Sequence, residues 1–429
     1  MTDPALSETA PSAHDESVRR AVAAVWRIES AKIVATLTRV VGDFSIAEDL
    51  AQEALLDALR QWPAEGVPCN GAAWLTAVAK RKAIDGWRRR ERLDERMAVI
   101  AHDLEREQAE AADAPPWDPD AVDDDVLRLI FISCHPVLSR EAQVALTLRV
   151  VGGLSSEEIA RAFLVPTATV QQRIVRAKKT LAAAHVPFEM PPRDEHAARL
   201  GAILGVLYLI FNEGHAASSG PEWMRPELSL EAIRLTRVLA ALMPRERDAH
   251  SLLALMELTA ARFPARVDQH GEPVLLADQD RRRWDRSRIA RGRAALATAD
   301  ALGSGRGPYG LQAAIAECHA LAASVDETDW ERIVLLYEAL GRIAPSPVVE
   351  LNRAAAVAMA TGPASALRII DQLSASGALA GYHLLPATRG ELLLRLGRDE
   401  EARSEFAVAA ALAGNDRERA LLEAKAAER

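Results

Sequence analysis

The sequence predicts an all-α protein. Hydrophobic residues make up 49% of the 429 residues but aromatic residues only 4%, and strands favour aromatic and β-branched side chains over the alanine that is abundant here. Apolar residues recur at helical spacing from Ser17 onward, with breaks rich in Pro, Gly and Asp. A chain of this length is expected to form about two to four domains.

The N-terminal residues, the longest apolar stretch and the cysteines predict a cytoplasmic protein with no membrane segment. The first residues are polar and acidic, unlike a signal peptide. The longest apolar stretch, 200–211, is too short to span a bilayer. Cys69, Cys134 and Cys318 lie far apart without a CxxC motif, which is typical of reduced structural thiols.

Breaks in the helical pattern divide the chain into five parts. We expect a disordered N-terminus (1–16), a helical domain (17–92), an acidic linker (93–125), a compact helical unit (126–188) and a long helical extension (189–429). Residues 91–125 carry 13 acidic and 3 basic side chains, a net charge of −10, whereas residues 126–188 carry a net charge of +5. The overall charge of −9 therefore hides basic surfaces that could bind nucleic acid.

Residues 153–181 have the pattern of a helix-turn-helix. Ser155 or Ser156 can cap a first helix with Glu158 in its first turn, and residues 164–166 break it. In a second helix from about Thr167, the apolar residues Val170, Ile174, Ala177 and Leu181 share one face. The polar side suits a DNA major groove, because Gln and Arg can pair with base edges while cations bind phosphates. The candidate DNA-binding residues are Thr169, Gln171, Gln172, Arg173, Arg176, Lys178 and Lys179.

Residues 45–62 predict an amphipathic helix with an acidic stripe. Ile46, Leu50, Ala54 and Ala58 are expected to form its core face. Asp49, Glu53 and Asp57 recur every four residues, and such like charges repel one another in an isolated helix. The stripe suits a basic partner, although a solvated face is the commoner explanation.

After a Pro- and Gly-rich loop (62–71), residues 72–90 begin apolar and end strongly basic. Trp74 and Trp87 are interleaved with this charge. Cations beside exposed aromatic rings suit single-stranded DNA, because charge follows the backbone and rings stack on bases. For Trp74 we expect core packing instead.

Together, residues 17–185 resemble the extracytoplasmic-function sigma factors, which keep sigma regions 2 and 4. The resemblance implies that AEDLAQEALLDAL docks on the clamp of core RNA polymerase through Asp49, Gln52 and Glu53. It implies that residues 153–179 read the −35 promoter element and contact the polymerase flap. It also implies that the loop and the basic helix hold the opened −10 element; the residues concerned are Asn70, Gly71, Lys80, Arg81, Lys82, Trp87, Arg88 and Arg89.

Two positions depart from that family. Many relatives have Asn where this chain has Arg81, so −10 recognition here would depend more on phosphate contact. Leu164 stands where the helix-turn-helix usually has Gly, and a bulky residue disfavours positive φ.

FLVP (163–166), followed by a long helical extension that contains YLIFNEGH (208–215), resembles one subgroup of these sigma factors, whose members carry a C-terminal tetratricopeptide-like domain. Residues 353–371 align with 389–407 at an offset of 36, pairing Ala366 with Ala402 and Ile370 with Phe406. Two ordinary helix pairs are the alternative. In that subgroup the extension is thought to regulate activity, so no separate anti-sigma factor would be required.

Two polar clusters interrupt the extension and could be regulatory. They contribute Asn212, Glu213, His215, Asp278, Asp280 and Trp284. Their spacing fits no standard metal site, so we expect no metal and no cofactor. Arg281, Arg282 and Arg283 could also fold back onto the acidic linker.

Two other functions remain as alternatives. A dimeric helix-turn-helix repressor would explain residues 139–185 but leave the acidic stripe and the basic helix without a role. A pure interaction scaffold would make the DNA-binding patterns fortuitous. An enzyme is not expected, because GxSxG, P-loop and HExxH motifs are all missing from the sequence.

Overall fold

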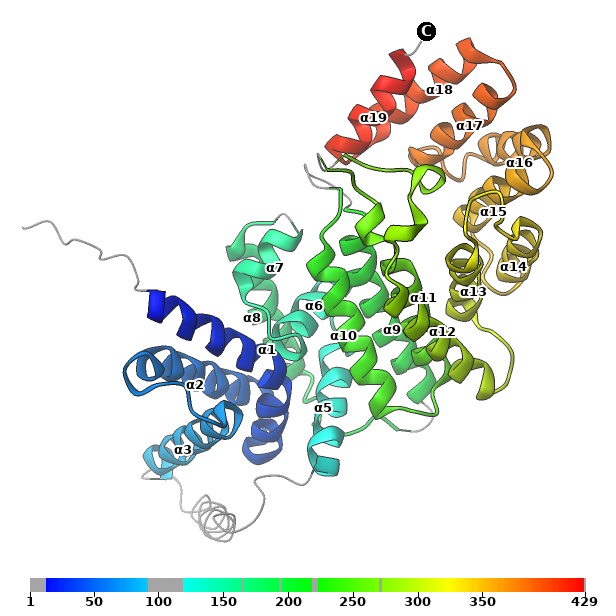
Figure 1. Cartoon of the computed structure of the whole chain (residues 1–429). Coiled ribbons are helices and arrows are strands. Elements are labelled where there is room, and N and C mark those ends of the chain that lie inside the picture. Colours follow the sequence, from blue (N-terminus) through cyan, green and yellow to red (C-terminus); the bar gives the residue numbers. More distant parts are fainter. Residues whose placement is uncertain are drawn as a thin grey trace, which may run out of the picture. The chain divides into compact units, whose positions relative to one another are not determined.

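The computed structural model describes residues 13–91, 119–163, 165–192, 195–217, 223–269 and 272–427. Within these residues the chain is helical and has no strand, and extended pairing is limited to isolated bridge positions such as Val267 with Pro273. The all-α prediction is therefore confirmed. The chain forms two compact units, 1–206 and 207–429, which are described separately (Figure 1).

The first unit begins with three helices, α1 (Ala13–Val41), α2 (Phe44–Glu65) and α3 (Gly71–Glu91), all packed against one another. Asp43 caps α2 by accepting a hydrogen bond from the Ile46 amide. The predicted core face of α2 is partly wrong. Ala54 and Ala58 are buried, but Ile46 and Leu50 are only half-buried, and the remaining buried apolar positions are Ala47, Ala51 and Trp62.

The second half of this unit contains α5 (Pro119–Ser133), α6 (Arg140–Leu146), the π-helical turn η2 (Thr147–Val151), α7 (Ser156–Phe163) and α8 (Thr167–Ala183). It is tied to α1 by Asp125, which is fully buried and binds Arg39 at 2.9 Å and Arg128 at 2.5 Å. A carboxylate withdrawn from water needs such partners. Asp125 therefore fixes α5 beside α1.

The expected domain boundaries differ from the helix ends. Helix α1 begins at Ala13, four residues before Ser17, and α5 begins at Pro119, inside the expected linker. The rest of the expected N-terminus and linker, 1–12 and 93–118, lies outside the described residues. Helix α9 (His196–His215) crosses the division between the two units at residue 206.

Helix α9 has the length and apolar composition of a membrane-crossing helix over Ala197–His215, which the sequence prediction underestimated. Its apolar residues Ile203, Leu207 and Ile210 are nevertheless buried. Burial of this kind is also typical of a core helix, so composition alone does not indicate a membrane.

The second unit continues with helices in sequence-neighbouring pairs (Figure 1). They are α10 (Pro226–Leu242), α11 (Arg247–Ala260), α12 (Arg286–Ala301), α13 (Pro308–Leu321), α14 (Trp330–Ile343), α15 (Pro347–Ala360), α16 (Pro363–Ser376), α17 (Leu384–Arg395), α18 (Asp399–Leu412) and α19 (Asp416–Ala427). Short 3₁₀ turns η3 (Phe263–Ala265), η4 (Leu276–Asp278) and η5 (Arg281–Arg283) lie between α11 and α12.

The 36-residue offset corresponds to two successive helical hairpins, α15–α16 and α17–α18. Helix α16 begins at Pro363 and α18 at Asp399. Ala366 and Ala402 are both buried, as are Ile370 and Phe406, in one continuous core. The paired residues therefore occupy equivalent places, while membership of the tetratricopeptide class stays a prediction.

The hairpin α17–α18 depends on a close approach at Gly390. A Cβ atom there would lie 2.8 Å from Cε1 of the Phe406 ring. We expect Gly390→Ala to destabilise the protein by about 1–3 kcal/mol, because the buried ring would have to move. Calorimetric melting of the full chain measures this.

Gly341→Ala is the matched control in α14, where the nearest atom to the new Cβ would be Val349 Cγ1 at 4.0 Å. Alanine should leave stability unchanged or raise it by up to about 1 kcal/mol. Equal melting of the two variants would contradict the packing account.

Candidate nucleic-acid interface

Helix α8 has one buried and one open face. Val170, Ile174, Ala177 and Leu181 are all buried, which confirms the predicted apolar stripe. Of the candidate DNA-binding residues, Gln171, Gln172, Arg176 and Lys179 are exposed, whereas Thr169 and Arg173 are partly buried. The helix therefore presents amides and cations to solvent from a fixed backbone, as a recognition helix requires.

The preceding helix α7 is fixed by a capping box. The Glu158 amide donates to Ser155 Oγ at 3.1 Å, and the Ser155 amide donates to Glu158 Oε2 at 2.7 Å. This confirms the predicted cap and identifies Ser155 as the capping residue. Leu164, the unusual turn residue, lies outside the described residues.

The two candidate residues of the predicted −10 loop, Asn70 and Gly71, differ in their exposure to solvent. Asn70 is exposed and caps α3, its Oδ1 accepting from the Ala73 amide at 2.9 Å. Gly71 is buried, and a Cβ there would lie 2.8 Å from the Trp62 ring. Trp74 packs edge-on against Trp62 at 5.5 Å, as expected of a core residue. Of Asn70 and Gly71, only Asn70 is therefore accessible to a ligand.

The cations of α3 differ in their surroundings. Arg81 is exposed, and Lys80 is partly buried. The side chains of Trp87, Arg88 and Arg89 lie outside the described residues. Lys82 bridges to the acidic stripe of α2, with Nζ 2.9 Å from Asp57 and 3.3 Å from Glu53. Its hydrogen bond to Asp57 raises the pKa of Lys82 above the ordinary value, and its bond to Glu53 adds to that effect despite partial burial.

A buried acidic residue that sequence reasoning missed connects α2 with the helix-turn-helix. Glu48 is 4% exposed. It forms an ion pair with Lys178 of α8, and its Oε1 atom lies 3.4 Å from Nε of Arg149 in η2. Lys178 also binds Asp49 at 3.1 Å. Burial disfavours the charged lysine, but the attraction of Glu48 and Asp49 raises the pKa of Lys178 above its ordinary value.

This contact uses residues to which the sequence assigned other partners. Asp49 was predicted to bind polymerase and Lys178 to bind DNA. In this conformation each is bound to the other, and Lys178 is only 14% exposed. The predicted acidic stripe therefore has basic partners within the chain, Lys82 and Lys178. The sequence signal was weak: a helical wheel centred on the buried alanines places Glu48 at the edge of that face.

Comparison with known proteins agrees with this arrangement. Residues 28–93 match the sigma-70 region 2 family and residues 128–181 match sigma-70 region 4. The RNA polymerase sigma-H factor of Pseudomonas aeruginosa is 31% identical over 157 residues, which are 36% of this chain and 81% of that protein. The chain belongs to the sigma-70 family.

Within that family it is similar to extracytoplasmic-function members. A probable ECF RNA polymerase sigma factor, SigI, of Mycobacterium tuberculosis is 29% identical over 173 residues, covering 40% of this chain and 58% of SigI. An uncharacterized protein of Rhizobium meliloti is 45% identical over 392 residues, 90% of each chain. Residues 199–300 match a family of unknown function (DUF6596). No solved structure matches the chain.

The chain is therefore a sigma factor, a DNA-binding protein that acts with RNA polymerase in transcription initiation. The two sigma-70 families that it matches consist of initiation factors rather than enzymes. Helices α2 and α3 fall within the region 2 match, and α6 to α8 fall within or end just beyond the region 4 match.

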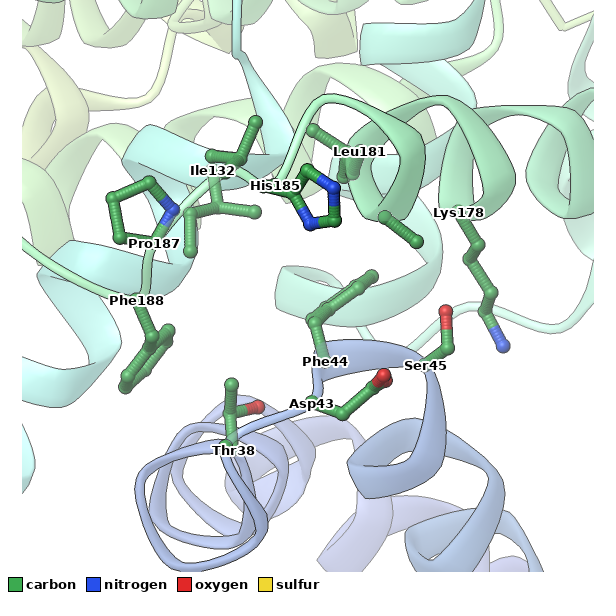
Figure 2. A pocket seen from close by; sticks show the side chains of 13 residues that line it. Thr38, Asp43, Phe44, Ser45, Ile132, Lys178, Leu181, His185, Pro187 and Phe188 are labelled. Atoms are coloured by element: carbon green, nitrogen blue, oxygen red, sulfur yellow. The ribbon is translucent and has the colours of Figure 1, made fainter.

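A pocket of about 300 Å³ lies between these two regions of the sigma factor. Figure 2 shows Phe44 and Leu181 on facing sides, with Phe188 at one end and Lys178 at the other. The α1–α2 junction and the end of α8 thus meet around a partly apolar hollow. The ion pairs of Lys178 lie at its edge, where they hold the two regions together.

The candidate regulatory residues lie in the second unit. Glu213 binds Arg225, Asp280 binds Arg282 at 3.0 Å, and Asp278 is exposed. Trp284 is buried beneath two guanidinium groups. Arg281 is also buried, donating to the carbonyls of His319 and Ala322, so it is not free to fold back onto the linker.

No metal site is evident in the part of the chain that the structure describes, since no three His, Cys, Asp or Glu residues are grouped suitably there.

We expect the Glu48–Lys178 contact to stabilise the first unit. Lys178→Met should cost about 1–3 kcal/mol, because Glu48 would remain buried with Arg149 alone. A double-mutant cycle with Glu48→Gln, measured by urea unfolding of the full chain, gives the coupling energy.

Lys179→Met is the control, since Lys179 is exposed and has no ion pair with a described residue. Its effect should stay below about 0.5 kcal/mol. Strictly additive effects of the Glu48 and Lys178 changes would show that the contact contributes nothing.

Proposed function

We propose that this sigma factor recognises the −35 and −10 promoter elements, and that its helical extension regulates initiation. The observation that carries the first part is the two-sided α8, with a buried apolar stripe opposite exposed Gln171, Gln172, Arg176 and Lys179. Amides and cations on a rigid helix suit base edges and phosphates in a major groove. Region 4 would also contact the polymerase flap.

Region 2 supplies the remaining contacts in this proposal. Asp49, Gln52 and Glu53 dock on the clamp of core RNA polymerase. Asn70 and the basic side of α3 hold the opened −10 strand, and Arg81 binds its phosphates. Asp49 is paired with Lys178 and Glu53 with Lys82. Docking on a basic polymerase surface therefore exchanges these intramolecular partners for intermolecular ones.

A regulatory extension would make a separate anti-sigma factor unnecessary and would act in the cytoplasm with polymerase. The proposal is supported by a large helical unit that follows directly on region 4. The alignment with the Rhizobium meliloti protein covers 90% of each chain, so that relative also has an extension after region 4.

Charge reversal on α8 should separate DNA binding from polymerase binding. Arg173→Glu with Arg176→Glu is expected to lower promoter-dependent transcription by about a hundredfold or more, because each cation contact contributes about 1–3 kcal/mol. Binding to core polymerase should persist. In vitro transcription and co-purification with core polymerase measure the two effects; loss of both would contradict the assignment.

The opposite result is expected for Asp49→Asn with Glu53→Gln. Neutral substitutions are preferable to reversals here, because a new cation would face Lys178 or Lys82. Affinity for core polymerase should fall by about tenfold or more, while the DNA contacts of Arg173 and Arg176, which have no ion pair with Asp49 or Glu53, should persist. Unchanged polymerase affinity would remove these residues from the docking surface.

Regulation by the extension is tested by comparing the full chain with a chain that ends at residue 217, which keeps α9 whole. We expect their rates of transcription with core polymerase to differ by about tenfold or more, the size of typical allosteric coupling. Equal rates would show that the extension does not regulate initiation.

A further inference from the structure

A cavity of about 620 Å³ lies within the second unit, between α9, α11, α13, α14 and the turn into α15. Its size is that of a typical small-molecule site. Its walls are partly apolar, formed by Phe211, Leu255, Leu258, Ile315 and Leu340. Such a cavity can enclose the apolar body of a ligand.

The cavity wall contains an arginine, Arg262, that has no ion pair with a described residue, unlike several other arginines of this unit. Among the described residues, no Asp or Glu lines the cavity and Arg262 is the one guanidinium on its wall; that group forms no hydrogen bond or ion pair with them. Elsewhere in the unit, Arg288 and Arg291 bind buried Glu257, at 3.0 and 3.1 Å. Arg262 therefore lacks the carboxylate partner that Arg288 and Arg291 have.

Two further arginines, Arg266 and Arg281, lie near enough to Arg262 to interact with its charge, and neither forms an ion pair with a described carboxylate. Arg266 donates to His215 and lies over the Trp223 ring at 5.6 Å. Arg281 donates to the carbonyls of His319 and Ala322, at 2.7 and 3.0 Å. Three guanidinium groups thus share one region, where Glu327 attracts Arg281 and no described carboxylate forms an ion pair with any of the three.

The pKa values reflect that arrangement. Burial, together with the charge of Arg281, lowers the pKa of Arg262 to about 10. Burial, together with the charge of Arg262, lowers the pKa of Arg266 to about 9. Both groups remain cationic at neutral pH, so the region is electropositive. Removing positive charge from water without a partner is unfavourable, and an anion would relieve this cost.

The other polar groups around the cavity are neutral. Burial lowers the pKa of His319 to about 3, and that of His215 falls well below its usual range. Burial raises the pKa of Tyr337 to about 12. The Nδ1 atom of His319 is buried without a hydrogen-bond partner among the described residues. These groups can orient a ligand but cannot balance the charge of Arg262.

From this geometry we infer that the second unit binds a small organic carboxylate with an apolar body, held at its charged end by Arg262. One planar guanidinium matches one carboxylate through two parallel hydrogen bonds, and the apolar side chains of the walls can pack against the rest of the ligand. This assignment goes beyond promoter recognition and does not depend on it.

The same geometry explains the two polar segments of the extension. Asn212 and His215 of α9 line the cavity, and Arg262 lies 5.9 Å from the centre of the Trp284 ring. Gly214 allows α9 to approach α10, since a Cβ there would lie 2.4 Å from the Ser229 amide nitrogen. Each segment therefore contributes residues at or beside the cavity: Asn212 and His215 on its wall, and Trp284 against Arg262.

Binding is tested on the full chain by calorimetric titration with benzoate, phenylacetate and 3-phenylpropanoate, each beside its neutral amide. We expect at least one carboxylate to bind about tenfold or more tightly than its amide, because the amide lacks the charge that pairs with Arg262. Inorganic phosphate is titrated in parallel. If no carboxylate is preferred over its amide, or if phosphate alone binds, the inference is overturned.

Arg262→Met should abolish the preference for the carboxylate, lowering its affinity by about tenfold to a hundredfold. Arg282→Met is the matched control, because Arg282 is exposed and paired with Asp280. Arg262→Lys keeps the charge and should retain part of the preference, which separates ligand binding from a general folding defect. Equal carboxylate affinity in Arg262→Met and the wild type would also overturn the inference. Transcription is not part of this measurement, so its result is independent of promoter recognition.

Discussion

The first unit depends on one buried carboxylate, Glu48, which contacts two other parts of the fold. Its partners are Arg149 of η2 and Lys178 of α8, so α2 is bound to both elements around the helix-turn-helix. A carboxylate that is 4% exposed cannot be left unpaired without a large cost. Ion pairing at this point therefore restricts how regions 2 and 4 can pack. It also gives Lys178 a structural partner that a DNA phosphate would have to replace.

The sequence was most informative where one helix determines the outcome. The apolar stripe of α8 and the Ser155–Glu158 capping box follow from helical spacing alone, and both are present. The core face of α2 was only partly predicted, because alanines occur on several sides of that helix and its buried face includes Ala47 and Ala51. Small residues give a weak periodic signal, so tertiary packing decides which of them is buried.

Contacts between distant residues could not be predicted in the same way. Lys82 was assigned to DNA and Glu53 to polymerase, yet they pair with each other. Gly71 was assigned to base capture, yet it packs against Trp62. In each case the residue type was compatible with both roles, and only the fold shows which neighbour lies within reach. The 36-residue offset is a different case, because a repeat carries its own long-range information; Ile370 and Phe406 accordingly share one core.

The two units differ in how their charged side chains are paired, and the difference is relevant to function. In the first unit the buried carboxylates Glu48 and Asp125 are matched by cations of the same chain. In the second unit Glu257 is matched by several arginines, but Arg262 faces a cavity without an anionic neighbour among the described residues. Internal pairs stabilise a fold, whereas a partly buried cation without a paired anion, such as Arg262, lowers stability unless a ligand supplies the opposite charge. An unpaired charge on a surface costs little, as at Arg176 and Lys179. The same charge on the wall of a partly apolar cavity is more costly, and binding of a carboxylate there would reduce that cost.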